Sequence, residues 1–220
     1  MFTGIIEHLG TIEALDLATG GGRVTIHAPG VVPNLAVSDS IAVNGCCLTI
    51  VALGKESFSA DLSGETIEKT SFGAKDRGMR KGSRVNLERP LTAGKEFGGH
   101  FVQGHVDTVG RVSRLAPEGE NWWLGVEVPR EFACYIVPKG SITVDGISLT
   151  VARWSNMTRI AEIAVIPYTC EHTNLRDRRP GDAVNLEGDV LGKYVERYLE
   201  TRSVASAPSI TMSRLLEEGF

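Results

Sequence analysis

The sequence predicts an all-β protein of two similar halves followed by one amphipathic helix. Three observations lead to this prediction: an internal repeat with a period of about 100 residues, short β-branched runs separated by turn residues, and helical spacing of apolar residues over 189–202. Short strands at such close intervals are typical of a β-sandwich or a small barrel. A closed barrel suits a compact repeat because closure removes the exposed edges of the sheet.

Three echoes of the repeat occur in the same order in both halves: 2–7 returns as 102–107, 41–50 returns as 142–151, and 85–88 returns as 184–187. The differences between the copies are as informative as the matches. Ile5 is replaced by His105, and Cys47 is replaced by Ser148, so one copy gains an imidazole and a hydroxyl. We expect such a pattern from two related pockets with different roles.

The expected strands are β-branched-rich runs bounded by Gly, Pro and polar turn residues. In the first half they cover 24–27, 41–43, 47–51 and 85–87, and in the second half 122–128, 142–144, 149–152, 160–166 and 184–186. Short helical turns are expected at 65–69 and 169–172, and 91–99 is expected to link the halves.

Apolar residues at three-and-four spacing predict the C-terminal helix. They are Val190, Leu191, Tyr194, Val195, Tyr198 and Leu199. Their stripe needs a cover, either the chain's own barrel or a second copy of the chain about a symmetry axis. The small polar residues of 203–209 predict a mobile segment, and a flexible tail is expected over 204–220.

The composition is that of an ordinary globular protein, with 220 residues, 42% hydrophobic and 23% charged, which is enough for two domains of about 100 residues each. A net charge of −4 without a basic stripe argues against a nucleic-acid partner. No apolar run approaches the roughly 20 residues of a membrane span, and the start does not resemble a signal peptide. Four cysteines without a Cys-x-x-Cys pair favour free thiols in the cytoplasm, and the histidine spacing predicts no metal site.

The candidate chemistry from the residues alone centres on two equivalent turn-strand segments. Cys47 and Thr49 should share one strand face, as should Ser148 and Thr150. These residues could line a pocket. Alternatively, Thr49 and Thr150 could be present only for their β-propensity, and Cys47 could be a small buried side chain of the core. His105 is the best general base near neutral pH. Lys139 ends a loop, where it could be a surface charge or could polarise a ligand carbonyl.

The segments 1–7, 44–49, 98–107, 145–150, 184–187 and 193–196 together resemble the riboflavin synthase family, and the resemblance covers about 1–202. It implies two homologous six-stranded Greek-key β-barrels followed by a C-terminal α-helix. The implied divisions are 1–97 and 98–188 for the lumazine-binding barrels, 189–203 for an oligomerisation helix and 204–220 for the tail. The helix would form a homotrimer, and each barrel would hold one 6,7-dimethyl-8-ribityllumazine, with the complete site between barrels of neighbouring subunits.

The implied reaction is a dismutation of two 6,7-dimethyl-8-ribityllumazine molecules, the last step of riboflavin biosynthesis. One molecule transfers a four-carbon unit to the other, giving riboflavin and 5-amino-6-(D-ribitylamino)uracil. No cofactor or metal takes part in the family's reaction. Association with a lumazine synthase shell is a further partner that the resemblance suggests.

The resemblance also assigns site residues by position. For the first pocket it implies Gly4, Ile5, Ile6, Cys47, Leu48, Thr49, Asp61, Leu62, Ser63, Gly64, Glu65 and Thr66. For the second pocket it implies Gly104, His105, Val106, Lys139, Ser148, Leu149, Thr150, Ile166, Pro167, Tyr168, Thr169, Cys170 and Glu171. Catalysis would centre on His105 and Ser148, supported by Thr150, Cys47 and Asp189.

In this scheme His105 helps to remove the acidic 7-methyl proton, and Ser148 hydrogen-bonds a substrate nitrogen or adds transiently to the ring. Gln103 and Tyr168 depart from the residues common in the family. The main alternative is a non-catalytic lumazine- or flavin-binding protein, which would lack the catalytic residues. A flavin-dependent reductase would need a nucleotide-binding domain for which the chain has no room.

Overall fold

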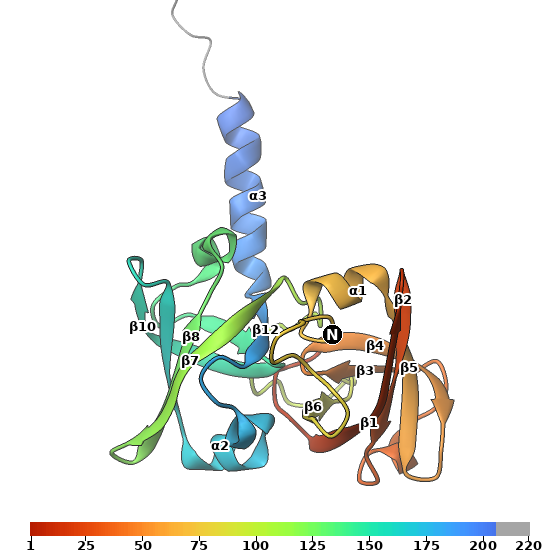
Figure 1. The fold of residues 1–220 in the computed structure, drawn as a ribbon. Coiled ribbons are helices and arrows are strands. Elements are labelled where there is room, and N and C mark those ends of the chain that lie inside the picture. Colours follow the sequence, from red (N-terminus) through yellow and green to blue (C-terminus); the bar gives the residue numbers. More distant parts are fainter. Residues whose placement is uncertain (206–220) are drawn as a thin grey trace, which may run out of the picture. The chain divides into compact units, whose positions relative to one another are not determined.

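The computed structural model describes residues 1–205, and within them two closed antiparallel β-barrels of six strands each confirm the expected fold class (Figure 1). The first barrel has the strand order β1-β2-β5-β4-β3-β6 and the second β10-β11-β8-β7-β12-β9, which is the same cyclic order for equivalent strands. The first set is β1 (His8–Ala18), β2 (Gly21–His27), β3 (Ser40–Val43), β4 (Cys46–Leu53), β5 (Ser57–Ser63) and β6 (Arg84–Glu88). The second set is β7 (Thr108–Glu118), β8 (Asn121–Glu127), β9 (Ser141–Val144), β10 (Ile147–Ser155), β11 (Ile160–Val165) and β12 (Ala183–Gly188).

Strand alternation fills both barrels with apolar side chains. On β4, Leu48 and Ile50 point into the first core, whereas Cys47 is half-buried and Thr49 is exposed. The equivalent Leu149 and Val151 lie in the second core. Each barrel interior is therefore packed with side chains, which leaves the outer faces for a ligand.

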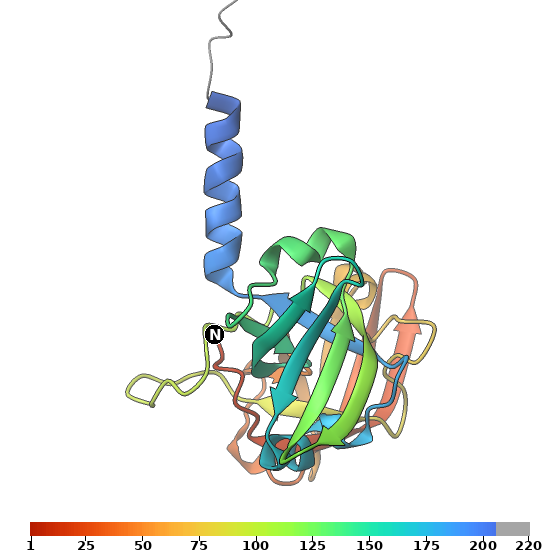
Figure 2. The same ribbon diagram turned by 90° about the vertical axis from the view of Figure 1, so that its left-hand side faces the viewer.

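Two short helices close the barrels at equivalent positions. α1 (Gly64–Lys69) begins after Ser63, whose Oγ accepts a hydrogen bond of 3.0 Å from the Thr66 amide. α2 (Pro167–His172) begins with a proline, which tolerates the first turn because its missing N–H has no helical acceptor there. Three 3-10 turns complete the connections, η1 (Val32–Asn34), η2 (Arg130–Tyr135) and η3 (Asn174–Asp177). The linker over 91–99 has no regular structure and projects from the barrels (Figure 2).

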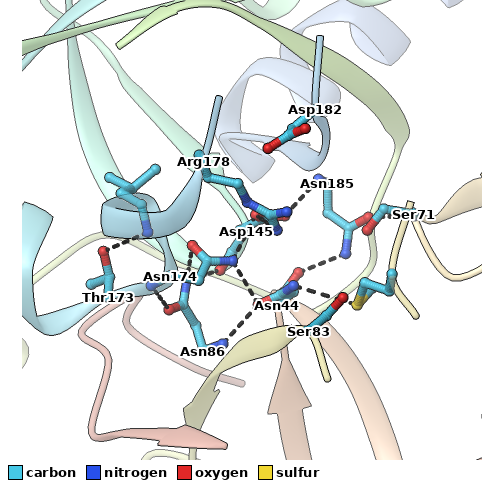
Figure 3. Close-up of polar contacts among 12 residues, drawn as sticks. Asn44, Ser71, Ser83, Asn86, Asp145, Thr173, Asn174, Arg178, Asp182 and Asn185 are labelled. Carbon is cyan, nitrogen blue, oxygen red and sulfur yellow. Dashed lines mark hydrogen bonds and ion pairs between the residues drawn. The ribbon is translucent and has the colours of Figure 1, made fainter. Parts of the chain in front are cut away.

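A buried polar network joins the two barrels where the Asn44-Gly45 and Asp145-Gly146 turns meet (Figure 3). The Asn174 amide Nδ2 donates to Asn44 Oδ1 at 3.1 Å and to Asp145 Oδ2 at 2.8 Å. The Asn86 Nδ2 donates to the Asp145 carbonyl at 2.9 Å, and the Asn185 Nδ2 donates to the Asn44 carbonyl at 2.8 Å. Residues from both repeats therefore satisfy one another, and this pairing fixes the barrels against each other.

The helix α3 (Val190–Ala205) belongs to a separate unit that begins at Val190, whereas Met1–Asp189 forms one compact unit. The helix was expected over 189–203, so it extends two residues into the expected tail, and 206–220 lie outside the described residues. Its apolar side chains form one exposed stripe, Leu191, Tyr194, Val195, Tyr198 and Leu199. Among the described residues, no helix combines the length and apolar character that a membrane span requires.

Candidate active site

The first residues of each repeat cross over to the barrel of the other repeat. Phe2 and Val102 meet in an antiparallel bridge, in which their amides donate to each other's carbonyls at 2.7 and 3.2 Å. Beyond this bridge, Ile6 packs against the core of the second barrel and Val106 against the core of the first. The chain therefore exchanges its two leading segments around the bridge.

The crossing requires glycine at two equivalent positions. The Ser148 amide donates to the Gly4 carbonyl at 2.8 Å, and the Cys47 amide donates to the Gly104 carbonyl at 2.8 Å. Gly4 has a φ of +77° and Gly104 a φ of +82°, a region that L-residues rarely adopt. A Cβ at Gly4 would lie 2.6 Å from the Ser148 Cβ, and a Cβ at Gly104 would lie 2.6 Å from the Cys47 Cβ. Each leading segment is thus pressed against a candidate catalytic side chain of the other repeat.

A buried carboxylate holds the first segment in place. Glu88 accepts hydrogen bonds from the Thr3 amide at 2.7 Å, the Thr3 hydroxyl at 2.8 Å and the Gly4 amide at 3.0 Å. Burial raises the pKa of Glu88, and the bonds from Thr3 and Gly4 act in the opposite direction. Glu88 therefore serves as the anchor that sets where Gly4 and the residues after it lie.

A hollow of about 940 Å³ opens beside the first crossed segment. Its walls come from both repeats, because the segment over 4–9 faces β10, α2 and the start of β8. The lining residues are Gly4, Ile5, Ile6, Glu7, His8, Leu9, Trp122, Ile147, Ser148, Tyr168, Thr169, Cys170, Glu171, His172, Thr173 and Arg176. Apolar, aromatic and polar side chains therefore meet in one hollow, as they do in small-molecule sites.

Ser148 in this hollow has a histidine partner that the sequence analysis did not single out. The His100 Nδ1 lies 2.7 Å from the Ser148 Oγ, and its Nε2 lies 3.1 Å from the Thr143 Oγ1. His100 is 8% exposed, and this burial lowers the pKa of the imidazole, while the carboxylate of Asp189 acts in the opposite direction. A neutral imidazole keeps one nitrogen as an acceptor, so His100 can take the proton of the Ser148 hydroxyl.

His100 was given no role because it lies just after the expected linker over 91–99 and outside every expected strand. The one available signal was its place in Gly98-Gly99-His100, next to a repeat boundary. Its position is set by the first crossed segment, because the His100 amide donates to the Thr3 carbonyl at 3.1 Å.

The expected grouping of the site residues was wrong in one respect. Gly4, Ile5 and Ile6 were grouped with Cys47, but they line the hollow that contains Ser148. Conversely, the Gly104 carbonyl pairs with Cys47 on the other barrel, and His105 is exposed just after it. The physical reason is the crossing, which sequence alignment of the repeats cannot reveal.

The other expected residues fall into three groups. Tyr168, Thr169, Cys170 and Glu171 line the hollow, whereas Ile166, Pro167, Thr150 and Lys139 are exposed outside its lining. Leu48, Leu62 and Leu149 point into the barrel cores, so their side chains face away from any outer site. On the first barrel, Thr49 and Glu65 are exposed, Gly64 and Thr66 are half-buried, Asp61 pairs with Arg23 at 2.7 Å, and Ser63 caps α1.

The two thiols of the first barrel differ in environment. Cys46 points into the core, where burial raises the pKa of its thiol to about 12. Cys47 is half-buried on the outer side of β4, beside Gly104. Cys47 is therefore the thiol that a ligand can reach.

We expect Glu187→Gln to lower the turnover number of the reaction at this site about tenfold. The reason is that the substitution would displace His105, and a misplaced catalytic group lowers the rate. Glu187 accepts from the Gln103 amide at 2.7 Å and from the Gly104 amide at 3.1 Å, immediately before His105. A glutamine has only one acceptor oxygen for these two donors. Glu127→Gln, an exposed position on β8, is the matched control. Turnover by purified variants of equal thermal midpoint measures the effect, and an unchanged kcat for Glu187→Gln would remove its positioning role.

Comparison with known proteins agrees with this geometry. The model of the Lumazine binding domain family matches twice, over 3–90 and over 103–189. The riboflavin synthase of Actinobacillus pleuropneumoniae is 38% identical over 221 residues, covering all of both chains. That of Mycobacterium bovis is 45% identical over 204 residues, covering 91% of this chain and 99% of the relative.

The chain belongs to the riboflavin synthase family.

Solved structures with the same fold include a lumazine-binding relative of lower identity. LumP complexed with riboflavin superposes with a TM-score of 0.78 at 24% identity, covering 86% of this chain and 99% of that one. LumP complexed with 6,7-dimethyl-8-(1'-D-ribityl) lumazine superposes with a TM-score of 0.76, also at 24% identity. At this identity the likeness concerns the double-barrel fold. The two family matches end within a few residues of the two barrels, so the family's repeat is the repeat seen in the structure.

Proposed function

We propose that the chain is an enzyme that converts two molecules of 6,7-dimethyl-8-ribityllumazine into riboflavin and 5-amino-6-(D-ribitylamino)uracil. The observation that carries this proposal is the full-length likeness to riboflavin synthases in a chain whose outer barrel face has a hollow of about 940 Å³. The hollow is large enough for a fused bicyclic ring with a ribityl chain. Because one lumazine gives four carbons and the other receives them, the reaction needs no external oxidant or reductant.

The proposed chemistry divides between the two outer faces. On the second barrel, the Ser148 hydroxyl, held by His100, hydrogen-bonds a ring nitrogen of one lumazine or adds transiently to its ring. On the first barrel, His105 assists removal of the 7-methyl proton, and the preceding Gly104 lies against Cys47. Thr150 and Asp189 support the second face, Asp189 by its charge near His100.

In this proposal, the complete site forms where the outer face of a first barrel meets the outer face of a second barrel. The lining of the Ser148 hollow does not include Cys47 or His105, which supports a site completed by a second subunit. We propose that the first barrel of one subunit meets the second barrel of the next, in a homotrimer joined by α3. The exposed apolar stripe of the helix supports this self-association.

The proposed setting is the cytoplasm, in line with free thiols at all four cysteines. The divisions at 97/98 and 188/189 remain our proposal for the domains, and association with a lumazine synthase shell is a further proposed contact.

The test of the activity uses the purified protein and 6,7-dimethyl-8-ribityllumazine, with no cofactor or metal added. We expect riboflavin to appear by absorbance at a yield of one per two substrates consumed. Saturable binding of the substrate without riboflavin formation would instead identify a non-catalytic lumazine-binding protein.

The test of the assembly is sedimentation at micromolar concentration. We expect a trimer for the natural sequence and a monomer for Tyr194→Glu/Tyr198→Glu, because two charges in an apolar helical stripe cannot be buried at an interface. The variant should also lose turnover, since each complete site lies between subunits. A fully active monomer would contradict the shared site.

A further inference from the structure

A second hollow, remote from the Ser148 site in its lining, lies between the turns of the two repeats. Its volume is about 380 Å³, and its walls include five cationic side chains and two carboxylates. The cationic residues are Arg77, Arg80, Lys81, Arg84 and Arg178. Three more positive than negative charges meet here although the whole chain has a net charge of −4.

Ion pairs use only part of this charge. Arg84 binds Asp177 with two parallel hydrogen bonds of 2.5 and 2.6 Å, and Arg77 lies 3.4 Å from Asp182. In the part of the chain that the structure describes, Arg80 makes no ion pair. The same holds for Lys81, so two exposed cations at the mouth of the hollow are available to a ligand.

Arg178 adds a desolvated donor to the wall. Its side chain is 11% exposed, and its Nη2 donates to Asp145 Oδ2 at 2.5 Å (Figure 3). Its Nε is buried and has no hydrogen-bond partner among the described residues. An unpaired guanidinium N–H is costly to bury, so the site of Arg178 is polar but not fully satisfied by the chain itself.

The repeat provides an internal comparison for this hollow. In the second repeat, Asp182 Oδ2 accepts from the Arg179 amide at 2.8 Å, whereas at the equivalent turn the Ser83 Oγ accepts from the Arg80 amide at 3.1 Å. The two turns have the same local hydrogen bond, but the first has a hydroxyl in place of the carboxylate. The first turn therefore has no carboxylate at the position of Asp182, and the Ser83 hydroxyl proton makes no hydrogen bond to another described residue.

We propose that this hollow binds a phosphate group, either inorganic phosphate or a phosphate monoester. A dianion with several acceptor oxygens matches two free cations, a serine hydroxyl and a guanidinium edge converging from two repeats. Arg77 and Arg84 of the first repeat contact Pro180, Asp182 and Asp177 of the second, so the hollow lies at the barrel junction.

The test is calorimetric titration of the full chain with inorganic phosphate at constant ionic strength, with chloride as the reference anion. We expect saturable binding of one phosphate per chain. Ser83→Asp should weaken it at least about tenfold, because it introduces the carboxylate of the second repeat beside the anion. The folded turn at Asp182 shows that this geometry accepts aspartate, and Lys81→Gln offers an independent loss of one cation.

The matched control is Arg179→Gln, which removes the same charge at the equivalent turn but outside the lining of the hollow. It should leave the phosphate affinity within about twofold, since a solvated charge acts weakly at a distance. The proposed phosphate site would be contradicted if the binding heat did not saturate. It would also be contradicted if Ser83→Asp bound phosphate with the same affinity as the natural sequence.

A second titration, with glycerol 3-phosphate, distinguishes a site for a phosphate monoester from a site for inorganic phosphate. Tighter binding than that of inorganic phosphate assigns the site to a monoester, and weaker binding assigns it to the free ion. Both measurements are independent of riboflavin formation, so failure of the proposed activity would leave this result standing.

Discussion

Ser148→Ala should reduce kcat by at least about 100-fold while leaving the fold intact. The Ser148 side chain is half-buried at the wall of the 940 Å³ hollow, and its Oγ is 2.7 Å from the His100 Nδ1. Alanine removes the hydroxyl that contacts the imidazole at Nδ1 and lines the hollow. The measurement is single-turnover riboflavin formation, with substrate affinity determined separately. Turnover within a few-fold of the natural protein would exclude a catalytic role for Ser148.

His100 acts through Ser148, so its own replacement should give a distinct signature. His100→Gln keeps a hydrogen-bonding group but cannot accept the hydroxyl proton as a base, and kcat should fall about 100-fold with little change in substrate affinity. Thr143→Val, which removes the partner at Nε2, should have a smaller effect because the Nδ1 contact persists. If His100 had only a structural role, its replacement would lower the thermal midpoint of unfolding but would not lower kcat selectively while substrate affinity is unchanged.

The pH dependence follows from the direction of the His100 shift. Burial lowers the pKa of folded His100 below its ordinary value of about 6.5. The unfolded chain then binds the proton more readily, so the stability associated with neutral His100 is present above the unfolded pKa and is lost as the pH falls through the folded pKa. Turnover should fall in the same acidic range, because a protonated imidazole has no acceptor nitrogen. His100→Gln should flatten this part of the stability profile.

The repeat made much of the fold predictable from sequence. Runs such as Ile41–Val43 and Val85–Leu87 combine β-branched residues with bounding turns, and they correspond to β3 and β6. β1, β5 and β7 were not predicted, because their Gly, Asp, Glu, Ala and Pro residues carry weak β-propensity. β1 and β7 each pair with the strand that follows and also with a strand far along the chain, β6 and β12 respectively. Tertiary pairing therefore decided these strands where local preference could not.

The site was predictable in composition but not in arrangement. Cys47 and Thr49 were expected to share one strand face, as were Ser148 and Thr150, and the burial pattern of β4 and β10 agrees and makes this the outer face. The exchange of Gly4 and Gly104 between barrels leaves no periodic signal, since it depends on one antiparallel contact between residues 100 positions apart. The His100 partner of Ser148 was hidden for the same reason, because the crossed segment brings the linker to the second barrel.

The largest effect on stability is expected at the barrel junction, for Asp145→Asn. Asp145 is fully buried, and its carboxylate accepts from Arg178, from the Asn174 Nδ2 and from the Asn185 amide (Figure 3). Asparagine removes the charge that compensates Arg178 while keeping the size and the left-handed backbone, because the equivalent Asn44 adopts a φ of 45° and Asp145 one of 46°. Leaving one partner of a buried ion pair alone costs about 3 kcal/mol of unfolding free energy.

The first repeat provides the compensating partner. Where Asp145 meets Arg178, the equivalent Asn44 Nδ2 lies 3.4 Å from the Met79 sulfur, an uncharged contact in the same place. The double variant Asp145→Asn/Arg178→Met installs that pair in the second repeat and should recover most of the loss, because no charge remains buried. Denaturant unfolding of both single variants and the double variant gives the coupling free energy, expected at about 2 kcal/mol. Additive losses would show that the ion pair is not what holds Asp145, and that the amide bonds from Asn174 and Asn185 carry the junction instead.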